Sequence, residues 1–123
     1  MNLNTARIFV RDIDEAKRFY AGALGLRLKA DGSRHGFCVF DAGAATLVVE
    51  AVADGAPEED AGLVGRFTGL SFEVPNAQSA YEDLRSRGVA FTHAPEEQAW
   101  GGILATLRDP SGNELQICEQ PST

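Results

Sequence analysis

Two side chains of opposite charge could carry out chemistry on one surface of this chain. Glu50 and Arg7 lie in separate stretches whose apolar residues alternate with period two, and each belongs to the less apolar half of its stretch. A carboxylate beside apolar groups must be paired or hydrogen-bonded. The sequence leaves three roles open for Glu50: an ion pair with Arg7, an acceptor for a cationic or hydroxyl-bearing ligand, or a general base.

Aromatic residues could supply flat surfaces for a planar ligand. Trp100 is the only tryptophan and stands directly before two glycines, while Phe9 and Phe37 lie in strand-like stretches. Each of these rings could equally belong to an ordinary core. The sequence therefore leaves core packing and ligand contact open for all three.

Other kinds of reactive site are excluded by their missing motifs. The sequence contains no GxGxxG after a strand, no GxxxxGK[ST], no GxSxG and no HExxH. Its two cysteines, Cys38 and Cys118, lie in apolar stretches without CxxC spacing and without an assigned base. We expect both to be buried, reduced thiols.

The overall charge limits the partners. The chain has 123 residues, 18 of them acidic and 11 basic, with a formal net charge of −7. Nucleic acids and anionic membranes select clustered Lys and Arg, so we expect neither as a partner. No stretch approaches the roughly 20 apolar residues of a membrane span, and no basic segment leads into an apolar one at the N-terminus, which predicts a cytoplasmic protein.

An internal duplication positions these residues. Each copy reads as a strand, then an amphipathic helix, then a glycine suited to a left-handed helix end, and the copies begin 64 positions apart, at Thr5 and Gly69. The first helix is predicted over Asp12–Leu24 and the second over Asn76–Arg87. The further strands are predicted at about Leu26–Ala30, His35–Asp41, Ala45–Val52, Val89–His93, Gly102–Arg108 and Glu114–Glu119.

These elements predict an α+β fold built from two tandem βαβββ modules. Module 1 covers about 1–52 and module 2 about 68–123, and a Gly-, Pro- and acid-rich linker over about 53–67 has room for one short helical turn. We expect one domain, 1–123, in which the strands form a curved mixed sheet, a cup with the helices on its outer face.

One face of each predicted strand lies under a helix and the other is left uncovered. The covered residues are the apolar-rich ones: Ala6, Ile8, Val10, Leu47, Val49, Leu70, Phe72, Val74, Leu115 and Ile117. The uncovered positions mix small polar, apolar and charged residues. A curved sheet with such a face is typical of a concave ligand site, although a plain solvated face fits the pattern as well.

Six short phrases stand in a fixed order along the chain: Phe9-Val10-Arg11-Asp12, Phe19-Tyr20, Leu24-Gly25, Phe72-Glu73-Val74, Trp100-Gly101-Gly102 and Asp109-Pro110-Ser111-Gly112-Asn113-Glu114-Leu115. Together they resemble the vicinal oxygen chelate superfamily. The resemblance covers essentially the whole chain. That superfamily includes glyoxalase I, extradiol dioxygenases, fosfomycin resistance enzymes and the metal-free bleomycin resistance proteins.

The resemblance places four metal-ligand positions at Thr5, Glu50, Gly69 and Gln116, all on uncovered strand faces. Metal-dependent members typically have His, Glu, His and Glu there. Here a hydroxyl and an amide stand in two of these positions, and Gly69 has no side chain. His35 and His93 are expected near the rims of the sheets. A catalytic divalent site usually needs about three protein ligands with imidazole or carboxylate groups, so the sequence predicts that the metal has been lost.

The resemblance therefore implies a metal-free small-molecule-binding protein that sequesters or senses a planar or cationic ligand, without a cofactor. The alternative is a glyoxalase-like lyase or isomerase, or a dioxygenase, with either one divalent ion on a degenerate site of Glu50 and Gln116 or Glu50 as general base. A homodimer is also implied. The expected ligand-binding residues are Thr5, Arg7, Phe9, Phe37, Val48, Glu50, Gly69, Ser71, Trp100 and Gln116.

Overall fold

The chain divides into two compact units, each with its own sheet. The structure is a computed structural model that describes residues 1–122. Unit 1 comprises Met1–Arg66 and Pro110–Asn113, and unit 2 comprises Phe67–Asp109 and the chain from Glu114 onward. The four residues of unit 1 that come from the second module are a turn, and they contact the end of the first strand, as described below.

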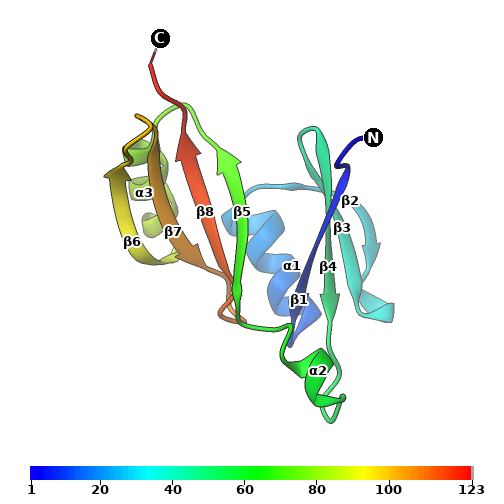
Figure 1. Cartoon of the computed structure of the whole chain (residues 1–123). Helices are drawn as coiled ribbons and strands as arrows, with labels where there is room; N and C mark the ends of the chain where they lie inside the picture. Colours follow the sequence, from blue (N-terminus) through cyan, green and yellow to red (C-terminus); the bar gives the residue numbers. More distant parts are fainter. Residues whose placement is uncertain (123) are drawn as a thin grey trace. The chain divides into compact units, whose positions relative to one another are not determined.

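The sheet of unit 1 has the strand order β1-β4-β3-β2, and that of unit 2 has the order β5-β8-β7-β6 (Figure 1). In each sheet the first two strands of this order run parallel and the others run antiparallel. The strands are β1 Thr5–Val10, β2 Arg27–Gly32, β3 Phe37–Ala42, β4 Ala45–Ala51, β5 Phe67–Glu73, β6 Ala90–Glu97, β7 Ile103–Arg108 and β8 Glu114–Glu119.

Each unit has one helix that packs on its sheet. In unit 1, α1 (Ile13–Lys17) contacts β3 and β4 and continues as a π-helical segment over Arg18–Ala23. In unit 2, α3 (Ala77–Ser86) contacts β6, β7 and β8. These elements confirm the predicted α+β fold with two βαβββ modules. The placement of both modules in one domain stays a prediction.

The helix ends follow from short-range polar contacts. Asp12 caps α1 by accepting hydrogen bonds from the backbone N–H groups of Asp14 and Glu15, and Asn76 caps α3 by accepting one from Ser79. Two shorter elements complete the list: α2, Glu58–Ala61, is the helical turn expected in the linker, and a 3-10 turn covers Ser33–His35.

The predicted covered faces form the cores. Of the covered residues, Ile8, Val10, Leu47, Val49, Leu115 and Ile117 are buried. The remaining four, Ala6, Leu70, Phe72 and Val74, are half-buried. Both cysteines are buried and free, as expected.

Two predicted elements differ from the structure. The first helix is α-helical only as far as Lys17, because the following six residues adopt the wider π-helical turn. This segment buries the adjacent residues Phe19 and Tyr20, and Tyr20 packs against Phe40 with 5.9 Å between ring centroids. Strand β6 extends beyond the predicted end at His93, because its pairing with β7 continues to Glu97.

The buried side chain of Asn113 holds three backbone segments of unit 1 together. Its Nδ2 donates to the Phe9 carbonyl oxygen at 2.8 Å, and its Oδ1 accepts from the backbone N–H groups of Gly65 at 2.9 Å and Arg66 at 3.3 Å. The side chain of Arg11 adds two hydrogen bonds to carbonyl groups of the same turn. Asn113 therefore fixes the end of β1, which carries Arg7 and Phe9.

We expect Asn113→Ala to destabilise the protein by about 3 kcal/mol, because it leaves three backbone groups without their partner. Chemical denaturation of both proteins measures the difference. Asn76→Ala is the control, since loss of an exposed helix cap costs about 1 kcal/mol. Equal losses in the two variants would contradict the role given to Asn113.

Candidate functional site

Arg7 and Glu50 form a two-point ion pair on the uncovered face of the unit 1 sheet. The Arg7 Nε donates to Glu50 Oε1 at 2.7 Å, and Nη2 donates to Oε2 at 2.9 Å. The side chains are 57% and 29% exposed, respectively. Hydrogen bonding and the charge of the carboxylate raise the pKa of Arg7. Of the three roles left open for Glu50, the structure shows the ion pair.

The register of the strands explains why these two side chains meet. β1 and β4 are parallel, with Arg7 opposite Val48 and Phe9 opposite Glu50. The Arg7 side chain therefore passes its direct neighbour Val48 and bonds to Glu50, which lies two residues further along β4 on the same face. Its guanidinium carbon lies 5.1 Å from the centroid of the Phe9 ring. The cation is thus held by a carboxylate and also contacts an aromatic ring.

Phe37 closes the other side of Glu50. It lies opposite Glu50 across the β3–β4 pair, and its ring covers Gly32 so closely that a Cβ there would be 2.3 Å from the ring. The structure therefore brings five of the predicted site residues together on one face. We call this group the Arg7 surface: Arg7, Phe9, Phe37, Val48 and Glu50.

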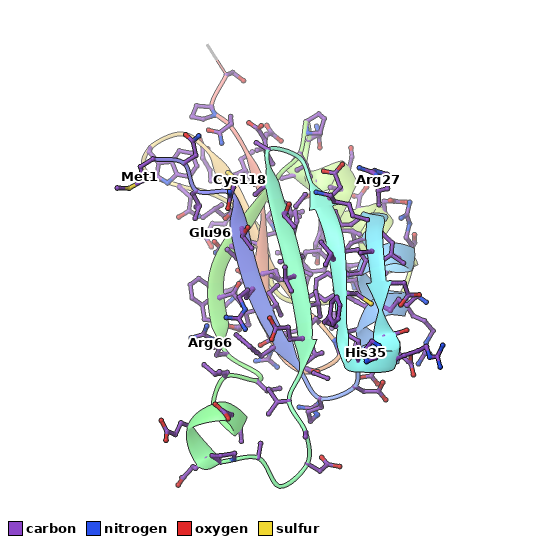
Figure 2. The ribbon with its side chains drawn as sticks, turned by 90° about the vertical axis from the view of Figure 1, so that its right-hand side faces the viewer. Met1, Arg27, His35, Arg66, Glu96 and Cys118 are labelled. Atoms are coloured by element: carbon purple, nitrogen blue, oxygen red, sulfur yellow. The ribbon has the colours of Figure 1, made fainter. Side chains whose placement is uncertain are left out.

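Thr5 and the histidine of this unit lie at the ends of the strands that carry the Arg7 surface. Thr5 stands at the start of β1, opposite Thr46, and its hydroxyl donates to Asn4. His35 ends the 3-10 turn before β3, and Figure 2 shows it at the opposite end of β2 from Arg27. The prediction that His35 lies at a rim is confirmed.

A row of polar side chains crosses the uncovered face of the unit 2 sheet. Ser71 donates to the Gln116 side-chain oxygen at 3.3 Å, and the Gln116 amide donates to the Thr106 hydroxyl at 3.4 Å. Thr106 is opposite His93 in β6. The row lies beside an open depression of ≈ 310 Å³, which is lined by Phe67, His93, Ala94, Glu96, Gln98, Leu104, Thr106, Glu114 and Gln116.

Sequence reasoning placed Gln116 correctly on this face but missed most residues of the depression. His93 was expected near a rim, at the end of β6. It is exposed on β6, which is the edge strand of the sheet, but β6 continues past it to Glu97, and His93 lines the depression. The alternation Leu104, Ala105, Thr106 could have indicated Thr106, since Ala105 is buried on the covered side. Nothing in the pattern identified Glu96.

The strand register also changes the relation between the two copies. Arg7 and Ser71 are equivalent in the repeat, and they pair with Val48 and Gln116, respectively. After the bulge in β5, Gln116 thus lies opposite Ser71, as Val48 lies opposite Arg7.

The backbone at Gly69 and the position of the Trp100 ring each require a glycine. Gly69 has a φ of 75° within a register shift of β5, a conformation that residues with a Cβ rarely adopt. Trp100 is 53% exposed, and its ring lies on Gly102, where a Cβ would be 2.0 Å from the indole. Both residues lie in unit 2. One face of the Trp100 indole rests on the backbone of Gly102.

The comparisons with known proteins agree with this fold. The family model of the Glyoxalase/Bleomycin resistance protein/Dioxygenase superfamily matches residues 2–117. The chain belongs to this superfamily. Among its relatives is YraH of Bacillus subtilis (strain 168), an uncharacterized protein that is 28% identical over 124 residues, which span 95% of this chain and 97% of YraH.

Two solved structures show the range of superfamily members that share the fold. TnmS3, an antibiotic binding protein from Streptomyces sp. CB03234, is 25% identical with a TM-score of 0.76, over 99% of this chain and 97% of TnmS3. Lactoylglutathione lyase from Agrobacterium tumefaciens is 18% identical with a TM-score of 0.76, over 96% of this chain and 92% of the lyase. The second likeness shows the fold alone.

The side chains at the four positions expected for the superfamily metal do not fit a divalent ion. Both oxygens of Glu50 accept hydrogen bonds from Arg7, and the Gln116 amide is hydrogen-bonded on both sides. A histidine at Gly69 would need a strained backbone. Thr5 offers only a neutral hydroxyl. This set supplies one charged donor, and that donor already has a cation as its partner.

Gly102→Ala should displace the indole of Trp100, because the new methyl group would occupy the position of the ring. Since Trp100 is the only tryptophan, intrinsic fluorescence measures the change directly, and we expect a red-shifted emission maximum. Gly22→Ala is the matched control, because no atom lies within 4 Å of the added methyl. Identical spectra for the two variants would show that the indole does not rest on Gly102.

Proposed function

We propose that this superfamily member is a metal-free small-molecule-binding protein that sequesters or senses a planar organic ligand. The observation that carries the proposal is the two-point ion pair between Arg7 and Glu50. A metal ion at Glu50 would have to compete with the charge of a guanidinium that matches the carboxylate geometry. We also propose a homodimer, as the resemblance implies, and a cytoplasmic location. No helix within residues 1–122 is long and apolar enough to cross a membrane.

The surroundings of the ion pair support the binding of an organic molecule. On the Arg7 surface, Phe9 and Phe37 are half-buried, so each offers part of its ring to a ligand. Separately, unit 2 has its own depression, lined by hydrogen-bonding groups beside apolar ones, and this mixture is typical of small-molecule sites. An antibiotic-binding function is stated for TnmS3, which is 25% identical to this chain.

The enzymatic alternative has less support from the same geometry. A general base needs a free lone pair directed at the proton that it removes. Each oxygen of Glu50 accepts one N–H group of Arg7, so two of the four lone-pair sites of the carboxylate are occupied. Catalysis through Glu50, as a base or as a metal ligand with Gln116, would have to compete with the bound guanidinium.

We expect protein purified without chelators to contain far less than one metal ion per chain. Mn, Fe, Ni and Zn should each leave the melting temperature unchanged, because the Arg7 guanidinium competes for Glu50 and the other three positions supply no charged donor. Elemental analysis and thermal shift measure these two quantities. Ligand affinity measured with a planar aromatic panel should not change on addition of EDTA.

A stoichiometric metal ion would contradict the proposed metal-free state. Close to one metal ion per chain, lost in Glu50→Gln but retained in the control Glu58→Gln, would establish the metal-dependent alternative. Glu58 lies in α2 and is exposed, so its substitution tests only for a general loss of negative charge.

A further inference from the structure

We propose that Arg7 is a specificity-determining, ligand-contacting residue, and that the Arg7 surface selects planar aromatic molecules with carbonyl or other oxygen acceptors at their edge. Such ligands are neutral or anionic rather than cationic. This inference rests on the proposed small-molecule function and names its ligand class.

Glu50 holds the guanidinium of Arg7 in place but engages only some of its N–H donors. Arginine has five N–H donors in one plane, and the ion pair engages one on Nε and one on Nη2. For the other three, the described residues 1–122 provide no acceptor within hydrogen-bonding distance. With 57% of the side chain exposed, these donors are accessible to a ligand.

The plane of the guanidinium also offers a stacking surface. Phe9 lies on one side, with its centroid 5.1 Å from the guanidinium carbon. Guanidinium groups stack well on aromatic rings, and a group already fixed by a carboxylate loses little further conformational entropy when a ligand binds. A flat ring that lies beside the guanidinium, on the exposed part of the Phe9 ring, can therefore accept the remaining N–H groups through an oxygen at its edge.

The charge balance decides against a cationic ligand on this surface. Glu50 is the carboxylate of the Arg7 surface, and its charge is compensated by Arg7 at 2.7 Å. A cationic ligand would gain no net attraction from the pair and would meet the exposed guanidinium. The sequence-based expectation of a planar or cationic ligand is thereby narrowed to the planar class.

The same sheet contains a matched control arginine. Arg27 in β2 donates from Nη2 to Asp41 at 2.9 Å and is 69% exposed. Among the cation–ring contacts of residues 1–122, none involves Arg27. Arg27 thus has a comparable exposure and a one-point ion pair, without the aromatic neighbour.

The test uses two probes with the same three fused rings. Acridone is neutral and carries a carbonyl oxygen, whereas 9-aminoacridine is a cation at neutral pH and carries an amino donor. Fluorescence anisotropy of each probe gives its affinity for the unaltered full chain, Arg7→Lys and Arg27→Lys. Thermal melting of the three proteins shows whether each variant is folded.

We expect acridone to bind the unaltered protein more tightly than 9-aminoacridine. Arg7→Lys should weaken acridone binding about tenfold, because lysine keeps the charge but loses the planar donor array. Arg27→Lys should leave both affinities unchanged.

Tighter binding of 9-aminoacridine, or an equal loss of acridone binding in both lysine variants, would overturn the inference while leaving small-molecule binding intact. If the unaltered protein bound neither probe, the proposed planar-ligand function would fail together with it.

Discussion

The functional character of this chain depends on one ion pair. Glu50 is the strongest potential metal ligand among the four positions indicated by the superfamily resemblance, and Arg7 from the adjacent parallel strand takes both of its oxygens. Because the arginine also contacts Phe9, the three residues form a connected group of carboxylate, cation and ring. A position suited to a chelating acid has thus become part of a flat, polar and aromatic surface.

The fold supports this group through a contact far away in the sequence. Asn113 is buried in unit 1 and binds the carbonyl of Phe9, two residues after Arg7 in the same strand. It also binds the end of the linker at Gly65. The turn that the sequence analysis identified as a family phrase is therefore a structural element of the first sheet, where its asparagine satisfies backbone groups that would otherwise lack partners.

Much of this arrangement was predictable because strands and helices have simple periods. The period-two pattern correctly separated the covered residues, such as Ile8 and Val49, from the uncovered Arg7 and Glu50. The caps Asp12 and Asn76 also followed from local chemistry. Shared parity made the Arg7–Glu50 pair one of the three roles left open for Glu50. Its two-point geometry required the register of β1 against β4, which no single strand contains.

The remaining features depend on contacts between strands that the sequence does not specify. The bulge at Gly69 changes the register of β5 against β8. The resulting register pairs Gln116 with Ser71. The length of β6 is set by its pairing with β7. This pairing continues β6 past His93, so His93 lies within the strand and lines the depression. Residue patterns show which face a side chain occupies, whereas pairing decides which side chains meet.

The most direct measurement of the central claim is the side-chain NMR signal of the Arg7 Nε–H group in ¹⁵N-labelled protein during titration with Zn²⁺. If the ion pair occupies Glu50, this signal keeps its position and intensity at several equivalents of Zn²⁺, as does that of the control Arg27. A saturable change in the Arg7 signal at one equivalent, absent from Glu50→Gln, would mean that a metal ion replaces the guanidinium and would contradict the account.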